Sequence, residues 1–312
     1  MTAIYQPGRD QRALADSFID SLAPLLPIER LHRSVDEDAA TWAALDALGL
    51  FEMAVNEDAG GLGLGAVEEV LVVTALGRCL ASPSVLATLA AAHARYAGER
   101  PRRVFAAFDG FAADCPSGAP VLLRDGETTG IFATASIGTA QDTTHWLSDL
   151  APVETGEQLG RFDAAAALRL RLIEAAALAG LADGACAMAV GYAQVREQFG
   201  RAIGSYQAVK HFCANMAIAA QSAGDLVTFA AVALDNGRTD AAAQAEAAWI
   251  AAAQAALGNA ATNIQIHGGI GFSDEADPHL FIKRARLLVA AGSGIEASLD
   301  RIAGRDVRPV AI

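Results

Sequence analysis

The stretch Arg-Glu-Gln-Phe-Gly-Arg at residues 196–201 joins two long alanine-rich segments and decides how the C-terminal half of the chain folds. The segment before it runs from about Ala164 to Phe199, and the segment after it runs from Ser205 to Asn236. Alanine favours helix because its side chain loses no conformational entropy there. The sequence therefore predicts two long helices joined by a tight turn.

Two further helices complete this half. Gly237 can cap the second helix, since glycine is common just past a helix end. A third helix is expected to start after Thr239 and to stop at a diglycine, and a fourth to follow Pro278, a residue that suits a first helical turn. Four long antiparallel helices form a bundle. Residues 161–312 are therefore predicted to be a four-helix-bundle domain.

Residues 1–100 are predicted to be an N-terminal helical domain. Within it, residues 56–65 read Asn-Glu-Asp-Ala-Gly-Gly-Leu-Gly-Leu-Gly, which is too rich in glycine for a helix interior and indicates a turn whose backbone approaches another group closely. The helices of this domain are expected at Arg9 to about Leu26, near Asp36 to Gly49, about Ala66 to Leu80, and Ser82 to about Tyr96.

Residues 101–160 differ from both flanks. Proline, glycine and threonine increase, and short apolar stretches at 121–123 and 130–134 flank a turn at Asp125-Gly126. These features predict a small strand-containing segment. The predicted fold is mainly α, with an N-terminal helical domain, a truncated β-containing middle segment and a C-terminal four-helix bundle.

Composition narrows the classes of function. The 312 residues are 53% hydrophobic and 19% charged, and their net charge is −13, which argues against binding to nucleic acid. An anionic ligand must therefore be held by a few specific cationic side chains and helix N-termini, because the net negative charge of the protein repels it.

The cysteines and the hydropathy of the chain indicate where in the cell the protein is expected. The cysteines show no C-x-x-C or C-x-x-H spacing, which indicates free thiols in a reducing cytoplasm and no metal site. The first residues lack the apolar stretch of a signal peptide, and Gln, Glu or Asp interrupts each apolar run before about 18 residues. We therefore expect a cytoplasmic protein that does not span a membrane. The four cysteines are Cys79, Cys115, Cys186 and Cys213.

The first candidate binding motif is the turn itself. Arg196, at a helix end, can donate two hydrogen bonds to a pyrophosphate, and Phe199 can pack on a planar ring, with Gln207 in the first turn of the next helix. The alternative interpretation is that Arg196 only offsets the helix dipole.

The second candidate motif is Gln-Ile-His-Gly-Gly-Ile-Gly-Phe at residues 265–272. A helix that stops in a diglycine leaves backbone N–H groups open to an anion or a ring edge. Gln265, Gly268 and Gly269 are the candidate binding residues in this motif. His267 is expected to be a cap or a packing group more often than a catalyst.

Together the two motifs resemble the acyl-CoA dehydrogenase family, in which R-x-x-F-G and Q-x-x-G-G are separate parts of one FAD site. In that family the bundle of one subunit contacts the ADP half of a flavin whose ring lies in the neighbouring subunit. Residues 56–65 also resemble the family's P-E-x-x-G-G-x-G turn, and residues 281–286 its Y-R-D-A-K segment, so the resemblance covers about residues 10–100 and 165–305. The resemblance implies FAD as the cofactor. The residues implied to contact it are Arg196, Phe199, Gln207, Gln265, Gly268 and Gly269.

The chain also departs from the family. Residues 101–160 are too few for the family's larger β-barrel, which cradles the flavin ring. Aligning residues 284–286 with D-A-K, without gaps, puts Gly292 where most members carry the catalytic glutamate. Other members place that glutamate directly before an arginine on the first bundle helix, where this chain has Leu170-Arg171. Neither glycine nor leucine can remove the α-proton of a thioester.

These features predict a subunit of a heteromeric FAD-dependent acyl-CoA dehydrogenase, of the α2β2 type that resembles those of bacterial steroid catabolism. Its full-length partner would supply the flavin pocket, the thioester pocket and the catalytic base, and electron-transfer flavoprotein is one suitable electron acceptor. One alternative is a homomeric acyl-CoA dehydrogenase whose base is Glu174 or Glu296. Another is a scaffold that binds FAD weakly or not at all.

Overall fold

The computed structural model describes residues 6–34, 36–125, 128–140 and 147–304. Its C-terminal half contains the four long helices that the sequence predicts. The side chain of Asp163 caps the first of them by accepting a hydrogen bond from the Ala166 N–H at 2.9 Å. Gly237, with φ of +63°, follows the second, and Pro278 is the first residue of the fourth. These helices are α5 (Ala164–Val195), α6 (Gln207–Asp235), α7 (Ala241–His267) and α8 (Pro278–Ala291), followed by the shorter α9 (Gly294–Ala303).

The N-terminal domain has four α-helices and short 3-10 turns. Two of the predicted ends are wrong: the first helix stops at Leu22, and the fourth stops at Ala91 because Arg95 and Tyr96 pair with a strand of the sheet. The helices are α1 (Arg9–Leu22), α2 (Ala39–Ala47), α3 (Ala66–Arg78) and α4 (Pro83–Ala91). The 3-10 turns of the described chain are η1 (Ile28–His32), η2 (Leu50–Glu52), η3 (Glu57–Ala59), η4 (Ile203–Ser205) and η5 (Gly268–Phe272).

Glycines bring the two helical domains into backbone contact. A Cβ added at Gly180 of α5 would lie 1.9 Å from the Thr74 carbonyl oxygen of α3, and one added at Gly77 would lie 2.1 Å from the Ala177 carbonyl oxygen. Because no side chain fits at either position, α3 and α5 cross with their backbones in direct contact. This crossing fixes the N-terminal domain against the bundle.

The glycine-rich segment at residues 56–65 approaches its own chain and the end of α6. A Cβ at Gly61 would lie 2.2 Å from the Val55 carbonyl oxygen, so the turn closes on itself. The Asp235 carboxylate then accepts hydrogen bonds from the Ala66 N–H at 2.8 Å and the Val67 N–H at 3.0 Å. The predicted close approach is therefore structural, because a carboxylate at the end of α6 caps the start of α3.

The middle segment forms a six-stranded sheet. Along it the strands lie in the order β1-β6-β3-β2-β4-β5, and only β2 and β4 run parallel to each other among the described pairs. The turn predicted at Asp125-Gly126 falls between β4 and β5, and residues 126–127 lie outside the described residues. The strands are β1 (Arg95–Tyr96), β2 (Phe105–Phe108), β3 (Phe111–Ala113), β4 (Val121–Asp125), β5 (Thr128–Ile137) and β6 (Leu150–Arg161).

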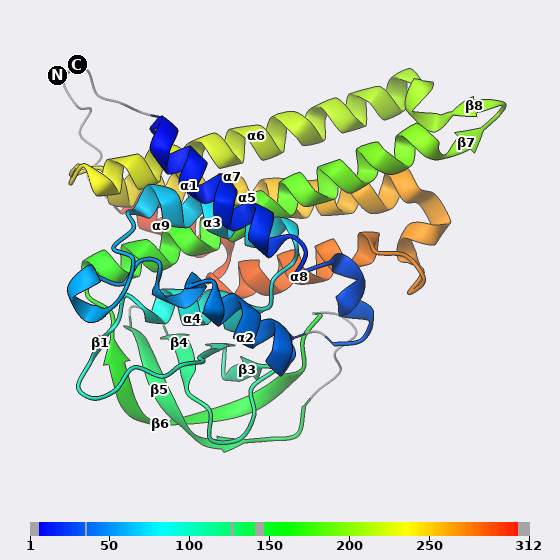
Figure 1. Ribbon diagram of the computed structural model, residues 1–312. Coiled ribbons are helices and arrows are strands. Elements are labelled where there is room, and N and C mark those ends of the chain that lie inside the picture. Colours follow the sequence, from blue (N-terminus) through cyan, green and yellow to red (C-terminus); the bar gives the residue numbers. More distant parts are fainter. Residues whose placement is uncertain (1–5, 35, 126–127, 141–146, 305–312) are drawn as a thin grey trace.

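The sheet closes into a small barrel. β6 pairs with β3 through residues 150–152 and also with β5 through residues 153–161, so β6, β3, β2, β4 and β5 follow one another in a ring. The middle segment is truncated, as predicted, but its strands still close into a reduced barrel. Figure 1 shows it at the opposite side of the molecule from α6, with α4 lying over it.

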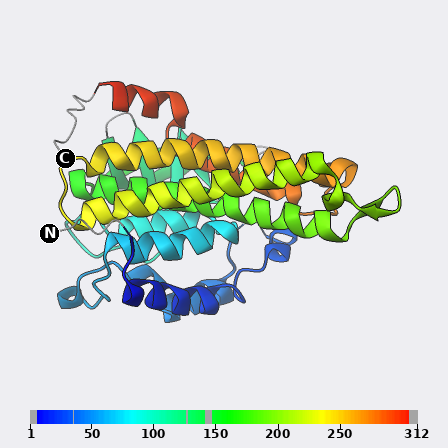
Figure 2. The same ribbon diagram turned by 90° about the horizontal axis from the view of Figure 1, so that it is seen from above.

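The long helices are buried to different degrees. By length and composition alone α5 and α6 are apolar enough to cross a membrane, although Glu174 and Asp183 interrupt α5, and Gln221 and Asp225 interrupt α6, as predicted. Of the most apolar stretch, 72% is buried within the structure for α5 and 39% for α6. A core helix meets the same criteria, so this is weak evidence for a membrane span. Figure 2 shows α6 and α7 covering α5 from one side.

Candidate functional site

The first motif forms a hairpin at the end of α5. The helix ends at Val195 and not at the predicted Phe199, because Arg196 is extended. Its chain continues into β7 (Glu197–Gln198), turns through Phe199 and Gly200 with φ of +53° and +80°, and returns as β8 (Arg201–Ala202). Positive φ at both central residues is the geometry of a two-residue hairpin turn. Figures 1 and 2 show the hairpin projecting beyond the bundle. Phe199, at its tip, is 93% exposed.

The second motif lies beside the first. α7 ends at His267, and Gly268 adopts φ of +68° and ψ of −143°, which only glycine adopts readily. The His267 ring stacks on Tyr192 of α5 with 4.0 Å between centroids, and its Nδ1 donates to the Asn263 carbonyl at 2.8 Å. Burial lowers the pKa of His267, so the packed ring favours its neutral form. This stack brings the two sequence motifs to the same end of the bundle.

The six predicted FAD contacts therefore lie at this end of the bundle. All six are exposed, and a Cβ at either Gly268 or Gly269 would meet nothing within 4 Å. The guanidinium of Arg196 and the amides of two glutamines can bind an anion, and the bare backbone of the diglycine admits its close approach. A surface of this kind can hold one side of a cofactor but cannot enclose it. Within the described residues no three metal-ligating side chains cluster here or elsewhere.

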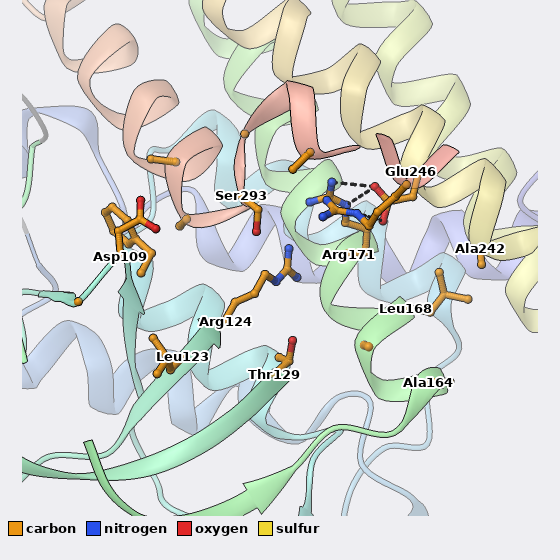
Figure 3. A pocket seen from close by; sticks show the side chains of 18 of the residues that line it. Asp109, Leu123, Arg124, Thr129, Ala164, Leu168, Arg171, Ala242, Glu246 and Ser293 are labelled. Atoms are coloured by element: carbon orange, nitrogen blue, oxygen red, sulfur yellow. Dashed lines mark hydrogen bonds and ion pairs between the residues drawn. The ribbon is translucent and has the colours of Figure 1, made fainter. Parts of the chain in front are cut away.

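A cavity of about 1100 Å³ lies near the other end of α5, between the barrel and the bundle. Figure 3 shows Arg124 reaching into it from β4, on the same side as Arg171 and Glu246, with Ser293 above. The predicted base positions lie at this end. The cavity is lined by residues from the barrel (Phe108, Asp109, Gly110, Leu123, Arg124, Thr129, Val153, Thr155), from α5 and α7 (Ala164, Ala167, Leu168, Arg171, Ala242, Glu246), and from the region around α8 and α9 (Ala290, Ala291, Ser293, Gly294, Ala297, Arg301).

Gly292, the first of the two base positions, has no room for a side chain. A Cβ added there would lie 2.5 Å from Cζ2 and 3.0 Å from Nε1 of Trp249, whose side chain is fully buried. Two non-bonded atoms cannot approach so closely. The indole therefore occupies the space that a glutamate at residue 292 would need.

Leu170, the second base position, is 4% exposed and lines a small apolar pocket of about 50 Å³. The next residue, Arg171, is also buried. Its guanidinium lies 3.8 Å from the centroid of the Trp249 ring and donates to Glu246 at 2.8 Å, to the Gly292 carbonyl at 3.0 Å, and to the Ser298 hydroxyl. Burial lowers the pKa of Arg171, and the carboxylates of Glu174 and Glu246 oppose that shift.

Neither alternative base is a free carboxylate facing this space. Glu174 accepts hydrogen bonds from Arg171 at 3.0 Å and is paired with Arg124 at 3.1 Å. Glu296 is exposed in the first turn of α9. Sequence reasoning missed Arg124, Glu246 and Trp249. The sequence did hold one signal for two of them. Glu246 and Trp249 are three residues apart in α7, a spacing that puts a carboxylate and an indole on one face of the helix.

Comparison with known proteins places these features in one family. The model of the acyl-CoA dehydrogenase C-terminal domain matches residues 164–306, and that of the N-terminal domain matches residues 9–100. The chain is 31% identical to acyl-CoA dehydrogenase IpdE2 of Mycobacterium tuberculosis over 264 residues, which cover 80% of each chain. It is 34% identical to acyl-CoA dehydrogenase FadE34 of the same organism over 78% of this chain, but it spans only 39% of that relative's length.

A solved structure shares the fold. The structure described as the ChsE4-ChsE5 complex from Mycobacterium tuberculosis aligns with a TM-score of 0.75 at 22% identity. The alignment covers 99% of this chain and all of the matched chain, so the reduced barrel and both helical domains have counterparts there.

Proposed function

Because this chain belongs to the acyl-CoA dehydrogenase family, we propose that it is the non-catalytic subunit of a heteromeric enzyme that desaturates a CoA thioester with FAD. In this proposal the chain binds the ADP side of the FAD, and a full-length partner supplies the flavin pocket, the thioester pocket and the catalytic base. The expected assembly is α2β2.

The observation that carries the proposal is the Trp249 ring beside Gly292. A dehydrogenase of this family needs a carboxylate to take the α-proton of the thioester. Here the residue at that position is glycine, and the indole fills the space beyond it at 2.5 Å from a Cβ. This chain has neither a carboxylate at that position nor the space for one, so in this proposal the base comes from another chain.

The exposed end of the bundle fits the ADP half of FAD. Arg196 would pair with the pyrophosphate, Gln207 and Gln265 would donate or accept through their amides, and the diglycine at 268–269 would let the ligand approach the backbone. Bound FAD supplies the hydride acceptor of the reaction. Phe199 would pack against the cofactor or the partner, since an aromatic ring that is 93% exposed at a hairpin tip suits an interface.

Exposed apolar side chains support an assembly. Along α6, Phe212, Ile218 and Leu226 are 44%, 65% and 40% exposed, and near the diglycine Phe272 is 77% exposed. A set of large exposed apolar groups is a common mark of a protein interface. The solved relative ChsE4-ChsE5 is itself described as a complex, which supports a second, different chain as the partner.

The proposal extends to substrate and electron acceptor. The resemblance to steroid-type subunits suggests a bulky, steroid-derived CoA thioester, bound mainly by the partner. Electron-transfer flavoprotein would suit as the electron acceptor. The homomeric alternative is disfavoured, because Glu174 is held by two guanidiniums and would have to break at least one ion pair to act as a base.

The test compares the chain alone with the chain co-expressed with a full-length dehydrogenase from the same source. The chain alone is expected to be nearly colourless and inactive, whereas the complex should be yellow and should reduce an electron acceptor. Absorbance near the flavin maximum and acyl-CoA-dependent dye reduction measure the two properties. Turnover at an ordinary enzymatic rate by the chain alone, shown free of partner, would overturn the proposal.

A further inference from the structure

Five charged side chains form a continuous chain, and four of them, all but Glu174, line the large cavity. Arg124 pairs with Glu174 at 3.1 Å, and Glu174 with Arg171 at 3.0 Å. Arg171 then pairs with Glu246 at 2.8 Å, and Glu246 with Arg301 at 3.1 Å. The signs alternate and both ends are arginines. This ion chain therefore carries one surplus positive charge.

The surplus charge lies where water screens it poorly. The side chains of Arg124 and Arg171 are 13% and 4% exposed, and that of Arg301 is 34% exposed. A partly buried charge without a counter-charge is costly, and a single anion placed beside the ion chain would balance it. The protein as a whole carries −13, so this positive wall is a local feature and not part of a basic surface.

The cavity offers hydrogen-bond donors beside the ion chain. Arg124 and Arg301, the two ends, both line the cavity, and a guanidinium has five N–H donors that it can divide between an acid and a ligand. Ser293, with φ of +73°, makes no capping hydrogen bond to α9, so its hydroxyl is available at the same wall. Figure 3 shows the Arg124 side chain extending toward Ser293.

The rest of the lining is mixed. Thr129 and Thr155 are polar, and Asp109 is a carboxylate that is exposed, so water screens its charge. Apolar side chains make up most of the other lining positions. Phe108, Leu123, Val153 and Leu168 contribute large or branched side chains, and the other apolar positions are alanines of the bundle helices. A volume of about 1100 Å³ is at the upper end of the range for small-molecule pockets. A pocket of this size that combines apolar side chains with a wall of arginines suits a ligand that has an apolar body and one anionic end.

We propose that this cavity binds an apolar monocarboxylate, whose carboxylate is received by the arginine ends of the ion chain. One surplus positive charge matches a monoanion, whereas the several phosphate charges of a CoA thioester would exceed it. The site is separate from the proposed FAD contacts, since Arg171 and Arg196 are 25 residues apart and a helix rises 1.5 Å per residue, about 38 Å in all. Failure of this site would leave the subunit proposal intact.

The test uses the full chain, purified alone, and isothermal titration with 4-phenylbutanoate at low ionic strength. The neutral amide, 4-phenylbutanamide, is the matched probe. Saturable binding of the acid at least tenfold tighter than that of the amide is expected, because only the acid balances the surplus charge. Equal affinities for acid and amide, or no saturable binding of the acid, would overturn the proposal.

Variants locate the site. Arg301→Gln should weaken binding of the acid at least tenfold and Arg301→Lys should weaken it less, since lysine keeps the charge. Arg286→Gln removes the same charge from an exposed position of α8 that does not line the cavity, and it should leave the affinity unchanged. Arg124→Gln tests the other end of the ion chain, and thermal denaturation checks that each variant folds. Equal weakening by Arg286→Gln and Arg301→Gln would contradict the assignment.

A third probe separates the two sources of negative charge. The CoA thioester of 4-phenylbutanoate carries the same apolar body but presents phosphates in place of a carboxylate. If the thioester binds and the free acid does not, the cavity is a residual thioester site and the proposal is wrong. If the acid binds and Arg301→Gln weakens it, the carboxylate is the group recognised.

Discussion

The two ends of α5 use the same kinds of side chain in opposite ways. At the C-terminal end, Arg196 and Phe199 are exposed, and the backbone of the nearby diglycine is open to space. Near the N-terminal end, Arg171 is buried against Trp249 and paired with Glu246. Near the N-terminal end of α5, here called the closed end, the arginine and the aromatic ring pack against each other inside the core. At the C-terminal end, the open end, the same kinds of group are exposed and are available to a cofactor or a partner.

The largest expected effect contrasts the two aromatic rings. Trp249→Ala should lower the free energy of unfolding by about 3–5 kcal/mol, since it empties a fully buried volume and removes the ring that stacks on Arg171. Phe199→Ala should change it by less than about 0.5 kcal/mol, because the ring is 93% exposed. Urea denaturation of the purified chain measures both. If the two variants lost similar amounts of unfolding free energy, the distinction between a buried Trp249 and an exposed Phe199 would be wrong.

The next effect concerns the cofactor. In the complex with its partner, Arg196→Ala should weaken FAD binding by roughly 1.5–3 kcal/mol, the size of a charge-assisted hydrogen bond, so that flavin leaves on dilution. The assembly and the unfolding free energy of the chain should be unchanged, because Arg196 is exposed. Flavin stoichiometry after gel filtration is the measurement. Full retention of FAD would show that Arg196 only offsets the dipole of α5.

A pair of glycine substitutions sharpens the comparison further. Gly292→Ala should cost about 1–3 kcal/mol of stability, since the new methyl group meets the Trp249 ring at 2.5 Å. Gly269→Ala, at the exposed end, meets nothing within 4 Å and should stay within about 0.5 kcal/mol of the parent. In a Trp249→Phe background the cost of Gly292→Ala should shrink, because the atom in closest contact is gone.

The same geometry governs any attempt to restore a base. Gly292→Glu should not produce activity, even in complexes whose partner has lost its own glutamate, because the carboxylate has no space beside the indole. Acyl-CoA-dependent dye reduction in that background is the assay. Recovered turnover would mean that this chain still forms a working flavin and thioester site, and the proposed division of labour would have to be abandoned.

The open end was predictable from the sequence because its signals are local. A turn motif between two alanine-rich segments and a diglycine at a helix end each lie within a few consecutive residues. Their roles as FAD contacts stay a prediction. Element ends were less predictable: α5 stops four residues before the expected end, since positive φ at Phe199 and Gly200 starts a hairpin that helical periodicity does not register.

The closed end was not predictable, because it is made by contacts between distant segments. The sequence predicts that Gly292 stands where most of the family carries the glutamate, but the indole that fills the space comes from α7, and Arg124 comes from the barrel. The closure of the truncated middle segment into a reduced barrel was not predicted, for a similar reason. A ring closes through the pairing of β6 with two strands, and pairing partners are not encoded in the local pattern of any one strand.

The smallest expected effect is a pH dependence at the open end. Burial lowers the pKa of His267 below its ordinary value near 6.5, although the Asn263 carbonyl and the charge of Asp277 oppose the shift. The unfolded chain then binds more protons than the folded chain between the two pKa values. The stabilising contribution of His267 to the free energy of unfolding is fully present above about pH 6.5. It is lost as the pH falls toward the lower pKa of the folded chain.

His267→Phe isolates this contribution, because phenylalanine keeps a ring against Tyr192 and cannot titrate. The unfolding free energy of the parent, relative to that of the variant, should fall when the pH is lowered from about 7.5 to about 5.5. Urea midpoints across that range measure the difference, and all other titrating groups cancel. A difference that does not vary with pH would mean that the His267 ring is as solvated in the folded chain as in the unfolded one. In the complex, the same variant should leave the pH profile of dehydrogenation unchanged, since His267 packs at the open end and takes no proton from substrate.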